Sequence, residues 1–400
     1  MPNNLPSTPA RRTSIKHVLA FIHLWVGIIF ALPFIALGLT GSILMLNHDI
    51  PPLFGETQAP TAITKPVGDI LAAAQRVVPE GVTPNIVMAP DHAGDPIVIR
   101  FNAARPSETP PQGGPPGAGA RGPVVSIDPE TLATTVNAPP AGSGPAAGGF
   151  NLQRLMHDLH GRLLIEGGIG RKIVGWLGVF MCFLGISGLV MWWPRGNAWA
   201  SAFTFKFGKS ALKTNRDMHG AVGIWGLVVF MVVSFSGAYL GFPQQIATFM
   251  DAAPMVRDQR GVQLPKVAPI EGETPATVDE AVALAQEKVP NTSLWSVIYP
   301  ARPDAPFRVN LTRVDDSKPV RIAVFVDHFA KKVAEVRDPA ALSGIDKFLI
   351  SQRGLHVGAG YGVVWWALVF LSGFLPLVFT VTGITMWWLK RRNKKRMQAA

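Results

Sequence analysis

The chain has 400 residues, of which 48% are hydrophobic and 16% charged, with eleven tryptophans against three tyrosines, a composition unlike that of an average soluble domain. The formal net charge of +11 could suit nucleic acid, but its basic residues gather beside apolar runs and are better explained as orienting a membrane protein. The single cysteine, Cys182, excludes an internal disulfide and a thiolate metal cluster.

Four uncharged apolar runs are long enough to cross a bilayer, which takes roughly 20 residues. They are Leu24–Leu46, Ile173–Trp193, Val222–Phe242 and Val363–Leu389. Basic residues precede the first run, fill the loop between the second and third, and close the chain. The positive-inside rule therefore predicts that both termini are cytoplasmic and that the two long intervening segments face outward.

Each outward segment is predicted to form a small α+β domain. The first carries a helical pattern at Val67–Val78, and the second carries one at Thr277–Gln286 that begins with an N-cap-like threonine. Alternating apolar runs predict strands near Asn85–Met88, Pro96–Asn102 and Pro123–Ile127 in the first domain, and at Ser293–Tyr299, Phe307–Thr312 and Arg321–Val326 in the second.

The predicted organisation follows in chain order. It comprises a cytoplasmic N-terminus (1–16), span 1 (17–47), outer domain 1 (48–158), span 2 with a short preceding helix (159–193), a cytoplasmic loop (194–218), span 3 (219–243), outer domain 2 (244–354), span 4 (355–389) and a cytoplasmic tail (390–400).

The two halves of the chain repeat one another. GLVMWW at 188–193 returns as GITMWW at 383–388, an offset of 195, and three further features return at an offset of 196. These are the histidines opening spans 1 and 3, a Thr/Ser-Gly step inside those spans, and a Leu-His step before spans 2 and 4. We interpret the chain as a tandem duplication of a unit made of a span, an outer domain and a span. Its two copies should be related by an axis along the membrane normal.

Only four of the nine histidines match across the repeat: His23 with His219, and His160 with His356. The repeat axis would let each pair face across the helix bundle at one depth, which is the arrangement of two axial ligands on haem iron. Glycines one helical turn after His23 and His219 remove bulk from the same face. The alternative interpretations are that the histidines lie at the membrane interface and that the glycines serve ordinary contacts between helices.

Other residues near the outer pair have open interpretations. Arg162 and Arg353 are candidate partners of haem propionates or of an acidic substrate, although they could equally anchor lipid headgroups. His48 and His157 could join His160 in an outer metal site, so zinc stays a competing interpretation.

Taken together, these motifs resemble the PepSY-associated transmembrane family over about residues 15–390. The resemblance implies PepSY-type α+β outer domains and two b-type haems in a bacterial inner-membrane protein. It also implies reduction of ferric siderophores on the periplasmic side, which releases weakly chelated Fe(II). His23, His219, His160 and His356 fit the family's recurrent histidines, whereas His48 and His157 depart from its pattern and are alternative outer ligands.

We therefore predict a membrane-embedded, haem-dependent ferric siderophore reductase. A membrane quinol or a separate reductase would donate the electrons, and nucleic acid is not an expected partner. One rival is a non-catalytic PepSY module that binds or regulates a partner protein. The other is a haem oxidoreductase that serves a different periplasmic acceptor.

Overall fold

The computed structural model describes residues 15–46, 62–90, 94–102, 121–137, 152–194, 196, 199–204, 210–253, 256, 264–313 and 321–399. The chain divides into two compact units, each assembled from segments distant in sequence. One contains the apolar helices (1–54, 152–249 and 348–400), and the other contains the strands (55–151 and 250–347). His48 lies outside the described residues.

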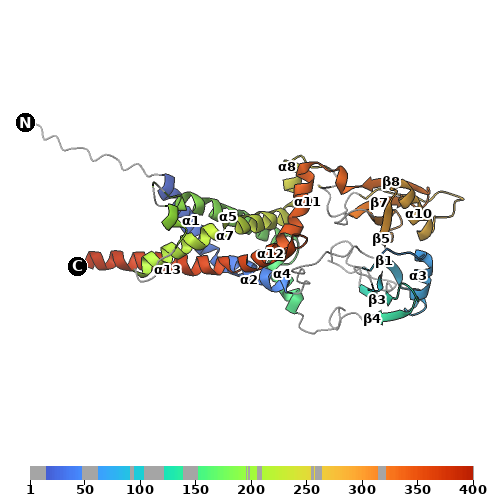
Figure 1. Ribbon diagram of the computed structural model, residues 1–400, viewed down its shortest axis with the longest axis horizontal. Coiled ribbons are helices and arrows are strands. Elements are labelled where there is room, and N and C mark those ends of the chain that lie inside the picture. Colours follow the sequence, from blue (N-terminus) through green and yellow to red (C-terminus); the bar gives the residue numbers. More distant parts are fainter. Residues whose placement is uncertain are drawn as a thin grey trace, which may run out of the picture. The chain divides into compact units, whose positions relative to one another are not determined.

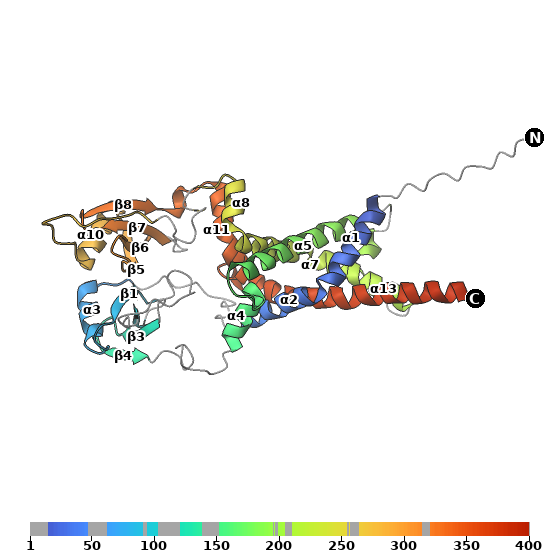
Figure 2. The same cartoon turned by 180° about the vertical axis from the view of Figure 1, so that it is seen from behind.

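Among its described residues, the helical unit contains three helices long and apolar enough to cross a membrane: α5 (Gly168–Trp192), α7 (Ala211–Gly241) and the stretch Gly362–Gln398. A fourth crossing arises if α1 (Ile15–Ile29) and α2 (Ala31–Met45), which meet at 64°, form one bent span. Figures 1 and 2 show α5 and α7 side by side from both directions. The prediction of four apolar spans therefore holds only if this bent pair is one span.

Prolines explain where two of the apolar runs are interrupted. Pro33 has no amide hydrogen for the carbonyl of Ile29, and α1 ends at Ile29. Pro376 stands in the same relation to Ser372, the last residue of α12 (Gly362–Ser372), before α13 (Leu375–Ala399) begins. The unbroken helices α5 and α7 contain no proline.

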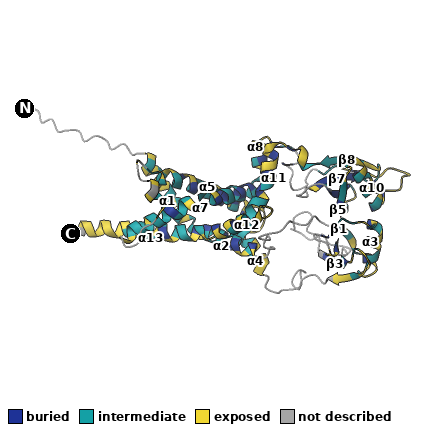
Figure 3. Cartoon of the chain, in the orientation of Figure 1, coloured by how far each residue is buried: buried dark blue, intermediate teal, exposed yellow. Residues whose placement is uncertain are grey.

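The end of α13 differs from the rest of the helical unit in its exposure. Figure 3 shows this end of the helix as exposed, and residues 391–398 are all exposed. They include Arg391, whose guanidinium lies 4.9 Å from the centre of the Trp387 ring, and Arg392, which lies 5.3 Å from that of Trp388. The arginines that follow the last apolar run thus lie over the two tryptophans at the end of that run.

The other unit is built on one antiparallel sheet in the order β4-β3-β2-β1-β5-β6-β7-β8. The strands are β1 (Thr83–Met88), β2 (Ile97–Asn102), β3 (Arg121–Ile127), β4 (Thr134–Asn137), β5 (Thr292–Ile298), β6 (Phe307–Arg313), β7 (Arg321–Asp327) and β8 (Lys332–Arg337). Helices α3 (Val67–Gln75) and α10 (Val278–Lys288) pack on it through a shared apolar core. All six predicted strands and both predicted helices are confirmed, whereas β4 and β8 were not predicted.

The strands of the two predicted outer domains form the two halves of this single sheet. They join where β1 pairs with β5, with Val87 opposite Val297 at the centre of the register. Amide-to-carbonyl hydrogen bonds from Ala89 to Trp295 (2.8 Å) and from Tyr299 to Asn85 (2.9 Å) extend this pairing. Joining the halves removes one open edge from each, which would otherwise present unpaired backbone groups.

A carboxylate ties the two helices of this unit together. Asp279, in the first turn of α10, accepts hydrogen bonds from the backbone amides of Val67 (2.7 Å) and Gly68 (3.1 Å) at the start of α3. A carboxylate at a helix N-terminus pairs with otherwise orphan amides and with the positive end of the helix dipole. Thr277 caps α10 itself in a capping box with Glu280.

Candidate functional site

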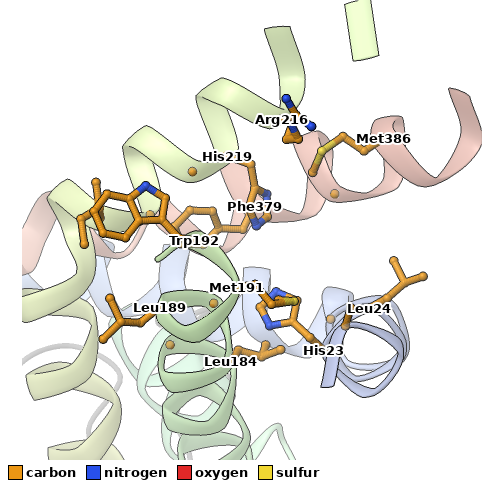
Figure 4. Close-up of a pocket in the computed structure, with 18 of the residues that line it drawn as sticks. His23, Leu24, Leu184, Leu189, Met191, Trp192, Arg216, His219, Phe379 and Met386 are labelled. Carbon is orange, nitrogen blue, oxygen red and sulfur yellow. The ribbon is translucent and has the colours of Figure 1, made fainter. Parts of the chain in front are cut away.

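The structure brings together His23 of α1 and His219 of α7, which we call the first histidine pair. Their ring centres are 6.4 Å apart and their planes are inclined by 69°. The Nδ1 atom of His23 lies 2.7 Å from the hydroxyl of Ser187, and that of His219 lies 2.8 Å from the hydroxyl of Thr382. Figure 4 shows the two rings pointing toward one another across a cavity.

The second histidine pair consists of His160 in α4 (Leu152–Arg162) and His356 in α11 (Gly344–Val357). The ring centres are 5.9 Å apart and the planes are inclined by 50°. Nδ1 of His160 lies 2.9 Å from the carbonyl oxygen of Leu37 and 3.3 Å from the hydroxyl of Thr40.

His356 repeats the contacts of His160 at an offset of 196 residues. Its Nδ1 lies 3.1 Å from the carbonyl oxygen of Val233 and 2.9 Å from the hydroxyl of Ser236. The two rings of the second pair are therefore held by equivalent groups of α2 and α7.

These contacts fix which ring nitrogen is available. Each of the four hydroxyls lies within hydrogen-bond distance of a backbone carbonyl of its own helix, to which it donates, so it can accept a proton from Nδ1. In the second pair the Leu37 and Val233 carbonyls can only accept. In the second pair both rings then carry the proton on Nδ1 and leave the Nε2 lone pair free, the state in which histidine ligates a metal. The hydroxyls of Ser187 and Thr382 allow the same tautomer in the first pair.

The spacing within both pairs suits one metal atom between two imidazoles. A metal atom about 2 Å from each ligating nitrogen, with each ring centre roughly 1 Å further away, sets the ring centres about 6 Å apart. The distances of 6.4 Å and 5.9 Å lie on either side of this value. The donor set and its spacing therefore fit axial ligation of haem iron at both pairs.

Each histidine also has a glycine beside its Cε1 atom. A Cβ atom added to Gly41 would lie 2.9 Å from Cε1 of His160, and one added to Gly237 would lie 3.2 Å from Cε1 of His356. The corresponding distances for the first pair are 3.5 Å at Gly188 and 3.9 Å at Gly383. Each glycine directly follows the hydroxyl residue that holds the same ring, so one Ser/Thr-Gly step both orients a histidine and makes room for it.

A cavity of about 870 Å³ surrounds the first pair. This volume falls in the range of roughly 300–1,000 Å³ that is usual for sites binding small molecules and cofactors. The wall includes both histidines, Gly27 and Gly223 one turn after them, and several aromatic residues. Figure 4 labels His23, His219, Trp192 and Phe379 among them. Most of the wall is apolar, as a porphyrin face requires.

The predicted basic partners lie in the helices that carry the second pair. Arg162 forms an ion pair with Asp158 at 2.8 Å, and its buried Nε atom has no hydrogen-bond partner among the residues that the structure describes. Arg353 is exposed one turn before His356. Asp158 has no equivalent in the other half of the chain, where Gly354 stands at that position.

The alternative ligand His157 is not brought into either pair. The His157 side chain is 77% exposed, and its Nδ1 lies 4.0 Å from Asp158. Among the described residues, no three side chains of the metal-binding types His, Cys, Asp and Glu gather in one place. Because His48 is outside those residues, the zinc hypothesis that includes it stays a prediction.

Sequence reasoning missed the groups that hold the rings. Ser187 and Thr382 belong to Ser/Thr-Gly steps in the second and fourth apolar runs, so the sequence contained a sign of their importance. The carbonyls of Leu37 and Val233 left no such sign, because every residue has a carbonyl and only the fold selects which one faces a histidine.

The apolar helices and the sheet together define a membrane-embedded protein with a helical core and a sheet domain. Comparison with known families identifies it further: residues 20–390 match the model of the PepSY-associated TM region, and the chain belongs to this family. No curated protein matches it. The predicted family is thus confirmed, and the haem chemistry stays a prediction.

Proposed function

We propose that this protein is a di-haem electron-transfer protein of the bacterial inner membrane that reduces ferric siderophores on the periplasmic side. The observation that carries the proposal is the presence of two histidine pairs at metal-bridging spacing, with every Nδ1 held by a hydroxyl or carbonyl of a neighbouring helix. Bound haem would supply a reversible one-electron Fe(III)/Fe(II) couple at each pair.

The proposal includes a tandem duplication with four spans and both termini in the cytoplasm. The recurrence of the ring contacts supports the duplication: Thr40 relates to His160 as Ser236 relates to His356, 196 residues later in each case. The bent α1–α2 pair serves as the first span. The basic residues on the two cytoplasmic segments and the tail support the orientation.

Helix α7 contributes to both pairs, so its length gives their separation along the membrane normal. It carries His219 of the first pair and, 17 residues later, Ser236, which contacts His356 of the second. At 1.5 Å per residue these positions are about 25 Å apart, close to the thickness of the hydrocarbon core. The first pair then serves an electron donor on the cytoplasmic side, a quinol or a separate reductase, and the second an acceptor in the periplasm.

The substrate follows from the family resemblance and from the chemistry of iron. Addition of one electron converts a tightly chelated Fe(III) siderophore to the Fe(II) form, which the siderophore holds weakly. The chain needs no acid, base or nucleophile for this reaction; its task is to hold and orient the iron ligands and to limit the access of water. Arg162 and Arg353 are proposed to bind carboxylates near the second pair.

The proposal is tested by the visible spectrum and the haem-to-protein ratio of the purified full-length chain. We expect two haems per chain, with His23→Ala and His356→Ala each losing one. His157→Ala is the matched control, because this exposed histidine belongs to neither pair, and it should keep both. A chain without a Soret band would overturn the proposal and favour a non-catalytic module that binds a partner protein.

A second measurement addresses the acceptor. The reduced protein is mixed with a ferric siderophore in the absence of oxygen, and its reoxidation is followed in the visible spectrum. Reoxidation at a rate that rises with siderophore concentration is expected. If only other acceptors reoxidise the protein, it is a haem oxidoreductase for a different periplasmic substrate.

A further inference from the structure

The cavity around the first histidine pair has two cationic side chains in its wall. Arg216 of α7 and Lys390 of α13 both line it, together with one acid, Asp217. Arg216 precedes His219 by three residues, so the two share a helix face, and Figure 4 shows Arg216 close to Met386. The cations come from two helices of the second half of the chain.

The first half of the chain contributes an apolar surface to the same cavity. Its residues from α1 are Ala20, Phe21, His23, Leu24, Gly27 and Ile28. Ala20 occupies the position that matches Arg216 at the offset of 196. Both cations of the cavity wall therefore come from the second half of the chain, whereas α1 contributes no charged residue to it.

Neither cation has a close ion-pair partner in the part of the chain that the structure describes. The Arg216 side chain is 69% exposed, and its Nε lies 3.9 Å from Asp217, at the outer limit for an ion pair. Lys390 is exposed and has no ion-pair partner among the described residues. Exposed pairs of this kind contribute little, so both cations are available to an anionic ligand group.

We propose that Arg216 and Lys390 bind the two carboxylates of the porphyrin at the first histidine pair and thereby fix which edge of the ring enters the cavity. This inference rests on the proposed function, because it assigns the ligand of that pair. Haem matches the cavity in three respects: an iron for the paired imidazoles, apolar faces for the α1 side, and two carboxylates on one edge for the two cations.

The test compares haem with its dimethyl ester, in which both carboxylates are blocked but the iron and the ring are unchanged. Each is titrated into the haem-free full-length chain in detergent and followed by the Soret band. The His356→Ala background leaves one site to be measured. We expect the wild-type cavity to bind haem about five- to thirty-fold more tightly than the ester.

The substitutions Arg216→Gln and Lys390→Gln should weaken haem binding and leave ester binding unchanged. Arg392→Gln is the control, because this arginine lies over Trp388 and outside the cavity wall. Asp217→Asn should act in the opposite direction and strengthen haem binding, since it removes a negative charge. This variant has nearly the same shape as the wild type and keeps the test valid if the glutamine variants fold poorly.

Equal affinities for haem and ester in the wild-type chain would overturn the inference, as would variants that weaken both ligands equally. Failure of the proposed function looks different, because neither porphyrin would then give the low-spin spectrum of bis-histidine ligation. The two outcomes are therefore distinguishable in one titration series.

Discussion

The closest fit in the proposed haem sites is between Gly41 and the ring of His160, and it predicts a graded response to added methyl groups. A Cβ atom at position 41 would lie 2.9 Å from Cε1 of His160, below the range of real Cβ contacts. The ring cannot withdraw freely, because Leu37 holds its Nδ1 at 2.9 Å. Overpacking of this kind costs about 1–3 kcal/mol, which corresponds to a loss of about 5- to 150-fold in the affinity of the second pair for haem.

The matched control is Gly383→Ala, whose new methyl group would lie 3.9 Å from Cε1 of His219 in ordinary contact. Gly237→Ala, at 3.2 Å, should be intermediate. Haem titration of the stripped protein measures the affinities, and a thermal melt of each variant checks its fold. The reasoning is refuted if Gly41→Ala binds two haems as tightly as the wild type, or if Gly383→Ala is the more damaging change.

Three further predictions concern hydrogen bonds and charge. Asp279→Ala should lower the free energy of unfolding by about 0.5–2 kcal/mol, measured by denaturant titration, because α3 loses its capping carboxylate; an unchanged midpoint would contradict this. Thr382→Ala should raise the midpoint potential of the haem proposed at the first pair, because His219 loses the hydrogen bond that increases its basicity. A spectroelectrochemical titration measures this potential. Partial burial raises the pKa of Asp338, but hydrogen bonds from Arg313 and a backbone amide outweigh burial and hold this pKa below its usual value of 3.8. The resulting stability is present at neutral pH and lost as pH falls through the lowered pKa, so the difference between wild type and Arg313→Gln should shrink in acid.

The histidine pairs were predictable because the sequence itself contains the symmetry. His23 and His219 occupy equivalent positions in the repeat, and equivalent positions fall at equal depth when two copies are related by an axis along the membrane normal. The distances within the pairs were not predictable, since they depend on how closely the helices pack. Backbone contact between α2 and the α12–α13 junction, at Gly38 and Gly373, is one such packing detail.

The strands were predictable where apolar and polar residues alternate, and they were missed where they do not. β4 is only four residues long, and β8 has charged residues at irregular spacing (Lys332, Glu335 and Arg337) with none of its side chains fully buried. The pairing of β1 with β5 was also missed. Alternation indicates that a strand has a buried face, but it carries no information about which edge of the strand meets another.

The sequence by itself determined the apolar runs, the repeat and the four matched histidines. These are local properties, set by hydropathy and backbone chemistry at each position. Only the tertiary structure decided that the eight strands share one sheet, that Ser187 and Thr382 hold the first pair, and that two cations line its cavity. Those features depend on contacts between residues more than a hundred positions apart, and such contacts are selected by the packing of whole helices and strands.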